Sequence, residues 1–123
     1  MTKRIEVNLA RNVVTAYEGD KAVKVFDCVC GRGGLTVPGE FRISRKIQDY
    51  RSRKYDAPMP FSLFFSDDGK AFHGSPWAVV RGYLQWLNIA DWGSHGCVGL
   101  DNSDAQWLYA WSPVGTAVRI YSG

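Results

Sequence analysis

The chain has 123 residues, 46% of them apolar and 22% charged, and a formal net charge of +3 at pH 7. At this size a chain forms one domain that buries roughly two-thirds of its unfolded surface, so we expect a single domain over residues 1–123. No apolar run approaches the roughly 18 residues that a membrane-spanning helix needs, which argues against stable membrane insertion. Met1-Thr2-Lys3-Arg4 leads directly into a strand pattern, so we expect no export signal in this chain.

Alternating apolar and polar residues predict a mainly β fold. The predicted strands cover residues 4–9, 13–17, 22–29, 39–44, 62–65, 71–73 and 117–121. Turn signals at Glu18-Gly19-Asp20 and Asp67-Asp68-Gly69 separate neighbouring strands. We therefore expect a β-sandwich or a barrel.

Two short helices are expected among these strands. Ser75 and Pro76 are a favourable N-cap and first-turn pair, and apolar residues at helical spacing follow, which predicts a helix over residues 76–88. The second helix should begin near Asn102 or Ser103 and end before Pro113. Its predicted inner face is Ala105, Leu108 and Trp111. The two helices would flank the segment that carries the candidate nucleophile.

That segment is Ser94-His95-Gly96-Cys97, where a thiol follows a histidine and a glycine. A cysteine has an ordinary pKa of about 8.5, so only a few per cent is thiolate at neutral pH, and a nearby imidazole commonly raises that fraction. His95 is close in sequence but has little freedom to align with a substrate. His73 ends a predicted strand, and Gly74 leaves the backbone open beside it. We therefore predict Cys97 as nucleophile and His73 as base, with His95 as the alternative.

The glycine before the cysteine suggests how an oxyanion would be stabilised. Gly96 lets the backbone approach a bound carbonyl closely, and the amides of Gly96 and Cys97 can then donate hydrogen bonds to the developing negative charge. Among the tryptophans, Trp92 lies two residues before Ser94 and is the candidate for stacking on a substrate. The pattern is that of an acyl-transfer site.

His73-Gly74, a long spacer and then Ser94-His95-Gly96-Cys97-Val98 closely resemble the active-site motif of the L,D-transpeptidases, the YkuD-type enzymes of bacterial cell-wall metabolism. Weaker matches extend the resemblance over nearly the whole chain. These include the strand-like segments at residues 5–9 and 115–120, Thr36-Val37-Pro38-Gly39-Glu40-Phe41, and Met59-Pro60-Phe61, which is similar to the segment near the family's substrate entrance. The resemblance implies a YkuD-like β-sandwich or barrel.

The resemblance also implies an activity. Cys97 would form a thioester with a peptidoglycan stem peptide, and an amine from another stem would resolve it to a 3-3 cross-link. His73 would be the base, oriented by the Gly74 carbonyl, while Ser94, Trp92, Phe61 and Met59 would contact the substrate. Stem peptides would be the partners, the cell envelope (periplasmic or extracellular) would be the location, and no cofactor is implied. The sequence leaves the oligomeric state open.

Three alternatives to cross-linking are compatible with the same resemblance. Attack of water on the thioester would make the protein an L,D-carboxypeptidase. An amide hydrolase with the same thiol and base would be a cell-wall-targeting enzyme, for instance a toxin. A binding module would retain the fold and hold peptidoglycan without turning it over. Two departures bear on the choice: Gly99 stands where the family commonly has Arg or Asn, and the spacer over residues 74–93 is longer than usual.

Two further features of the sequence favour structural interpretations. Cys28 and Cys30 should point the same way on a strand, and we interpret them as small buried hydrophobes, with a redox or metal role as the alternative. A zinc site that also includes His73, His95 and Cys97 lacks Cys-x-x-Cys spacing, so no metal is predicted. The basic residues between Arg42 and Lys54 are interpreted as a solvated loop face rather than a site for an anionic polymer. No nucleic-acid-binding signature accompanies them.

Overall fold

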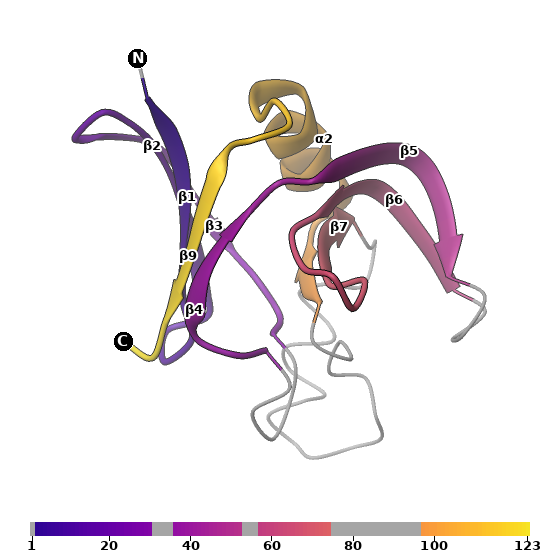
Figure 1. Cartoon of the computed structure of the whole chain (residues 1–123), viewed down its shortest axis with the longest axis horizontal. Helices are drawn as coiled ribbons and strands as arrows, with labels where there is room; N and C mark the ends of the chain where they lie inside the picture. Colours follow the sequence, from indigo (N-terminus) through magenta and orange to yellow (C-terminus); the bar gives the residue numbers. More distant parts are fainter. Residues whose placement is uncertain (1, 31–35, 53–56, 75–96) are drawn as a thin grey trace.

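A computed structural model describes residues 2–30, 36–52, 57–74 and 97–123. Within this part the chain forms two β-sheets, and Figure 1 shows them side by side with a helix at one end between them. The predicted mainly β, two-layered fold is confirmed. The predicted helix over residues 76–88 lies outside the described residues.

The first sheet contains five strands in the order β3-β2-β1-β9-β4. Its strands are β1 (Lys3–Asn8), β2 (Val13–Glu18), β3 (Lys21–Asp27), β4 (Gly39–Arg42) and β9 (Ala117–Tyr121). The predicted turn at Glu18-Gly19-Asp20 joins β2 to β3, and Gly19 has the positive φ of 58° that favours glycine there. The C-terminal strand β9 pairs with β1 in parallel and with β4 antiparallel, so it lies inside the sheet.

The second sheet has the order β5-β6-β7-β8. Its strands are β5 (Arg45–Ser52), β6 (Ala57–Phe64), β7 (Ala71–Gly74) and β8 (Val98–Leu100). Pro58 and Pro60 fit in β6 because β7 pairs only with the end of that strand, at Leu63 and Phe64, so the prolines interrupt no ladder on that side. The turn at Asp67-Asp68-Gly69 joins β6 to β7, as predicted, with Gly69 at a φ of 88°.

The sequence predicted one strand over residues 39–44, but the chain changes sheets within this segment. The Ile43 amide donates to the Thr116 carbonyl at 2.9 Å, beside β9, while the Ser44 amide donates to the Phe64 carbonyl at 2.8 Å, at the end of β6. Ile43 itself is buried in the core. Such a crossing from one layer to the other is how orthogonal and sandwich sheets form a corner.

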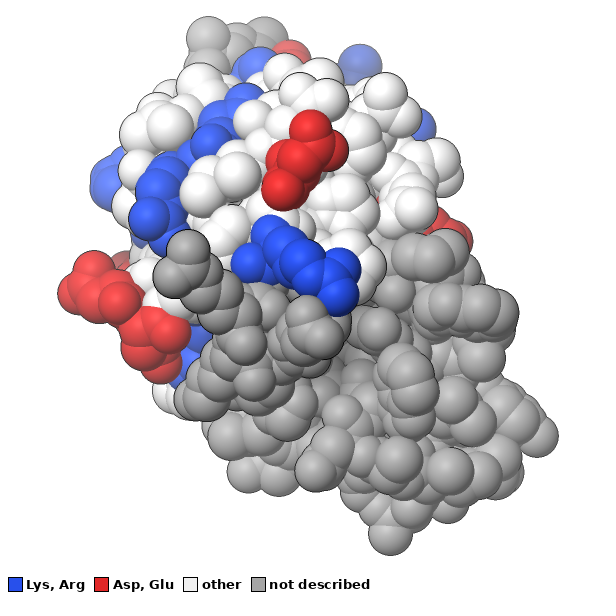
Figure 2. Space-filling model, turned by 90° about the vertical axis from the view of Figure 1, so that its right-hand side faces the viewer, with Lys and Arg blue, Asp and Glu red and all other residues white. Residues whose placement is uncertain are grey.

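The predicted loop is wrong for residues 45–52, which form the edge strand β5. The predicted solvated face is confirmed for Arg42, Arg45 and Arg51, which are exposed. Its cations contact other parts of the protein: Arg45 lies 4.4 Å from the ring centre of Phe64, and Lys46 donates to the Tyr109 carbonyl at 2.6 Å. The face seen in Figure 2 carries both basic and acidic side chains. These contacts explain why a charged stretch adopts a strand.

The helix α2 (Asn102–Trp111) confirms the second helix prediction, including the burial of Ala105 and Leu108. It packs mainly on β6 and β7. Its last turn contains no basic residue, but Lys46 binds the Tyr109 carbonyl and Lys3 donates to the Trp111 carbonyl at 2.7 Å. Two cations from separate strands therefore satisfy carbonyls at the negative end of the helix.

The main core lies between the two sheets and α2. It contains buried residues of both sheets, including Ile5, Val14, Phe72, Val98 and Leu108. A smaller group, which we call the site cluster, consists of Met59, Phe64 and Ala71, with Ile47, Tyr50 and Cys97 packed against it. The second sheet therefore buries apolar side chains on two faces.

Gly74 is where β7 meets the first turn of α2. A Cβ added at Gly74 would lie 2.7 Å from the Asn102 side chain and 3.1 Å from the Ala105 Cβ. We expect Gly74→Ala to lower the free energy of unfolding by about 1–3 kcal/mol, because the helix must move away from the strand. Urea denaturation followed by circular dichroism measures the change.

Gly99→Ala is the matched control on the neighbouring strand. A Cβ at Gly99 would meet only Val29 among the described residues, at ordinary contact distances of 3.7 and 3.9 Å. Because alanine costs less backbone entropy than glycine in a strand, its unfolding free energy should stay within about 1 kcal/mol of the wild type. Equal stability of the two variants would contradict a tight approach at Gly74.

Candidate active site

His73 is held in a defined orientation on β7. Its side chain is only 4% exposed, and its Nδ1 atom lies 3.1 Å from the Gly74 carbonyl oxygen. A carbonyl oxygen can only accept a hydrogen bond, so Nδ1 carries the proton in this contact. The neutral ring therefore has its lone pair on Nε2, which is the arrangement that a general base needs.

Cys97 directly precedes β8, which pairs in parallel with β7. In this register Phe72 lies beside Val98 and His73 beside Gly99, so Cys97 falls next to Ala71. Cys97 also packs against the site cluster that contains Ala71. The strand pairing thus brings a histidine and a cysteine from distant parts of the sequence onto adjacent strands.

The alternation of side chains shows which face these residues share. Phe72 and Val98 point into the main core, whereas Ala71 and Cys97 belong to the site cluster on the other face. His73 is two residues after Ala71 on the same strand, so it projects to the same face as Cys97. A thiol and an imidazole that are diagonal neighbours on one face of two paired strands can both contact one bound group.

Gly99 leaves space beside the imidazole. It is the register partner of His73 on β8, and its φ does not lie in the left-handed region. On its other side, Gly99 exchanges two backbone hydrogen bonds with Val29, at 2.8 and 2.9 Å. β8 is therefore held between β7 and the Val29 segment, and the position opposite His73 has no side chain.

The environment of Cys97 disfavours its thiolate form. Burial raises the pKa of Cys97 above its ordinary value, and the negative charge of Asp68 acts in the same direction. A backbone hydrogen bond from Ala71 and the positive charge of Lys70 lower the pKa but do not outweigh burial. A thiol whose pKa is raised needs a base to remove its proton before it can act as a nucleophile.

Four of the residues that the sequence singled out lie outside the described residues: Trp92, Ser94, His95 and Gly96. Their roles stay predictions. Of the two residues predicted near the substrate entrance, Met59 belongs to the site cluster with Cys97. Phe61 instead packs against the main core, with its ring 5.8 Å from that of Tyr109 on α2.

The backbone explains why Met59 and Phe61 have different surroundings. Phe61 has a φ of 55°, which is unusual for a bulky residue, and it has no register partner on β5, although the register of β5 and β6 is the same on either side of it. The buried Ser62 hydroxyl donates to the Met59 carbonyl at 2.7 Å and so spans Phe61. Sequence alternation alone assigns residues 59 and 61 to one face, so it could not anticipate this change.

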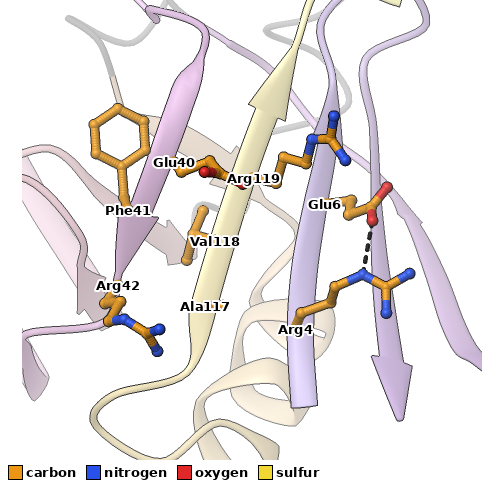
Figure 3. Close-up of a pocket in the computed structure, with 8 residues that line it drawn as sticks. All are labelled: Arg4, Glu6, Glu40, Phe41, Arg42, Ala117, Val118 and Arg119. Carbon is orange, nitrogen blue, oxygen red and sulfur yellow. Dashed lines mark hydrogen bonds and ion pairs between the residues drawn. The ribbon is translucent and has the colours of Figure 1, made fainter. Parts of the chain in front are cut away.

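A separate hollow of about 520 Å³ lies on the first sheet (Figure 3), and neither Cys97 nor His73 is among the residues that line it. Its lining comes from β1, β4 and β9 and includes both arginines and glutamates. Arg4 and Glu6 form an ion pair at 2.7 Å within it, so opposite charges partly compensate each other. We assign no ligand to this hollow.

Neither a metal-binding cluster nor a membrane-spanning helix is found in the described part of the chain. No three His, Cys, Asp or Glu side chains within residues 2–30, 36–52, 57–74 and 97–123 are grouped so that they could hold a metal ion. Across the same ranges, no helix has the length and apolar character to cross a membrane.

The charges beside Cys97 should set its reactivity. Asp68→Asn removes a charge that raises the thiol pKa, so more thiolate forms at a given pH and alkylation by iodoacetamide should accelerate roughly two- to fivefold at pH 7. Lys70→Met removes a charge that lowers the pKa and should slow alkylation by a similar factor. Peptide mapping by mass spectrometry assigns the label to Cys97.

Asp67→Asn is the matched control, because Asp67 is an exposed residue of the same turn and is not among the charges that shift the pKa of the Cys97 thiol. It should leave the alkylation rate of Cys97 unchanged. In the wild type the rate should keep rising with pH beyond the ordinary thiol pKa. The charge assignment fails if Asp67→Asn and Asp68→Asn have the same effect.

Comparison with known proteins identifies the family. The family model of the YkuD L,D-transpeptidase catalytic domain matches residues 2–120. No curated protein matches the sequence. Among solved structures, an L,D-transpeptidase from Stackebrandtia nassauensis has a TM-score of 0.84 and 26% identity, with coverage of 100% of this chain and 57% of that chain.

Two further solved structures share the fold. An Enterococcus faecium L,D-transpeptidase with a cysteine-to-serine substitution has a TM-score of 0.81 and 23% identity, with coverage of 98% of this chain and 50% of that chain. An LD transpeptidase in complex with imipenem has a TM-score of 0.83 and 19% identity, with coverage of 98% of this chain and 59% of that chain. This chain thus spans between 50% and 59% of the length of the three structures. Because the family model covers nearly the whole chain, the protein belongs to the YkuD family of L,D-transpeptidase catalytic domains.

Proposed function

We propose that the protein is a cysteine acyltransferase that acts on peptidoglycan stem peptides and forms 3-3 cross-links through a thioester on Cys97. The observation that carries this proposal is the placement of Cys97 and His73 on one face of the β7–β8 pair, in a chain of the L,D-transpeptidase family. The same face offers the apolar site cluster beside the thiol. We propose the cell envelope as the place of action.

In the first half-reaction, His73 Nε2 takes the proton of the Cys97 thiol as the sulfur attacks the carbonyl of the third residue of a donor tetrapeptide. The carbonyl becomes an oxyanion, for which the amides of Gly96 and Cys97 are the proposed donors. The C–N bond to D-alanine then breaks, and the leaving amine receives the proton from His73. The product is a thioester between Cys97 and the donor stem.

In the second half-reaction, the side-chain amine of another stem attacks the thioester carbonyl. His73 takes a proton from this amine, a new amide bond forms, and the Cys97 sulfur leaves and regains a proton. The same steps with water in place of the amine release a tripeptide, which is L,D-carboxypeptidase activity. The acceptor therefore decides between a transferase and a hydrolase.

Two properties of the site support this sequence of proton transfers. The raised pKa of Cys97 means that the proton must be removed during the attack, and the Gly74 carbonyl holds His73 in the tautomer that can receive it. His73 is buried and Cys97 is half-buried, which limits access of water to the thioester. Among the residues proposed to contact the substrate, Met59 has the strongest support because it packs in the site cluster.

Covalent labelling by a carbapenem tests the nucleophile. An LD transpeptidase has been crystallised with imipenem, and opening of a β-lactam ring by a thiolate leaves an acyl-enzyme. We expect the intact mass of the wild-type protein to increase by one imipenem-derived adduct, and Cys97→Ala to show no adduct. His73→Ala should form the adduct at least about a hundredfold more slowly, since general base catalysis typically contributes this much.

Cys28→Ala and Cys30→Ala are the matched controls, because both remove a thiol outside the site face. Both variants should keep the adduct. Labelling that persists in Cys97→Ala and disappears in either control would overturn the assignment of the nucleophile. A circular dichroism spectrum of each variant separates loss of the thiol from loss of the fold.

A defined tetrapeptide tests the reaction. With one stem peptide as donor and acceptor, mass spectrometry should detect free D-alanine and a peptide dimer joined by a new amide bond. D-alanine with tripeptide and no dimer identifies a carboxypeptidase, and cleavage at a different amide identifies a hydrolase of the alternative kind. If the peptide binds but is not consumed, the protein is a binding module and the proposal fails.

A further inference from the structure

Cys28 and Cys30 form a pair of buried thiols that the proposed acyl transfer does not use. Their sulfur atoms lie 3.7 Å apart, and the residues are 7% and 5% exposed. The expectation that they point the same way is therefore confirmed. Burial of two small apolar side chains does not require contact between their sulfur atoms. The contact between the two sulfur atoms therefore points to a further role.

The pair lies behind the strand that follows the candidate nucleophile. Val29, between the two cysteines, exchanges two backbone hydrogen bonds with Gly99 of β8. The Cys28 and Cys30 side chains join the main core together with Val98 and Leu100, whereas Cys97 belongs to the site cluster on the other face. The two thiols are thus separated from Cys97 by the sheet but share the hydrogen bonds that hold β8 in place.

The two thiols differ in acidity. The hydrogen bond between the two sulfur atoms lowers the pKa of Cys30, although burial opposes this effect. The same hydrogen bond and burial raise the pKa of Cys28. Cys30 is therefore the sulfur that ionises first, and Cys28 is the neighbour that keeps its proton. This division is found where one cysteine reacts and a second resolves the product.

We propose that Cys28 and Cys30 form a redox site that hydrogen peroxide oxidises to an intramolecular disulfide. The Cys30 thiolate attacks one peroxide oxygen, the O–O bond breaks, and hydroxide leaves, so that sulfur becomes a sulfenic acid and the peroxide is reduced. The Cys28 sulfur then attacks the Cys30 sulfur, the S–O bond breaks, and the Cys28 proton leaves with the hydroxyl group as water. In total, two thiols and one peroxide give one disulfide and two water molecules.

The burial of the Cys28 and Cys30 thiols determines which class of oxidant can reach them. Thiols that are 5–7% exposed are poorly accessible to a protein disulfide, which must bring its own sulfur into line with the attacked one. Hydrogen peroxide is close to water in size and requires only a small opening. The site should therefore respond to peroxide and resist bulky thiol reagents.

The disulfide should act on β8 through Val29. Two residues of extended chain span about 6.6 Å between Cα atoms, near the upper end of the range that disulfides tolerate. Closing the bond therefore draws Cys28 and Cys30 together and bends the backbone at Val29. We expect the two hydrogen bonds between Val29 and Gly99 to weaken, and the disulfide to be reduced easily because it is strained.

Cys97→Ala isolates the test from catalysis, because only Cys28 and Cys30 then carry thiols. After peroxide treatment and quenching, its intact mass should fall by two hydrogen atoms, and no thiol should react with iodoacetamide in denaturant. Dithiothreitol should restore both thiols. Wild-type protein with Cys97 already alkylated by iodoacetamide provides the same test without a substitution. Amide hydrogen exchange at Val29 and Gly99 should become faster on oxidation.

Two double variants identify the roles of the sulfurs. Cys28→Ser with Cys97→Ala should gain oxygen at Cys30, which dimedone traps as a sulfenic acid, and should lose no hydrogen. Cys30→Ser with Cys97→Ala should react more slowly with peroxide. The proposal is overturned if Cys28 and Cys30 both stay reduced at a peroxide dose that oxidises Cys97 in the wild type, or if only disulfides between two molecules form. Unchanged exchange at Val29 and Gly99 would overturn the coupling to β8. None of these outcomes depends on acyl transfer.

Discussion

The parallel pairing of β7 with β8 is the constraint on which the candidate site depends. Phe72 beside Val98 and His73 beside Gly99 define a register, and a shift by one residue would turn Cys97 into the main core. The apolar residues fix this register because Phe72, Val98 and Leu100 must all be buried between the sheets. The position of the thiol relative to the imidazole is thus determined by core packing, before any contact between the two groups is considered.

The two faces of the second sheet have different surroundings: one packs in the main core and the other carries the candidate site. Phe72 and Val98 contribute to the main core, while Ala71 and Cys97 face the site cluster. The end of β7 is held in addition by α2, whose first turn packs where Gly74 lacks a side chain, and the Gly74 carbonyl at the same point binds His73. One residue therefore connects the placement of a helix with the tautomer of the proposed base.

Alternation and motif spacing predicted much of this arrangement. β1, β2 and β9 were found because one face of each is buried, and α2 was found because Ala105 and Leu108 recur at helical spacing. β5 was missed because its cations are satisfied by contacts distant in sequence, such as Lys46 with the Tyr109 carbonyl. β8 has three buried residues and no alternation, and the left-handed backbone at Phe61 has no sequence signal. These features are set by tertiary contacts, which a periodic pattern does not record.

The position of β9 inside the first sheet has a consequence for biosynthesis. β4 pairs with β9, and β9 is also the parallel neighbour of β1, so a strand made late joins two parts of the chain made much earlier. Until residues 117–121 have left the ribosome, β1 lacks a partner along one edge and β4 has no partner among the described strands. Contacts of such long sequence separation form slowly, and this sheet can close only once β9 is available. A chain truncated before Ala117 would expose two open strand edges, which are sites for aggregation.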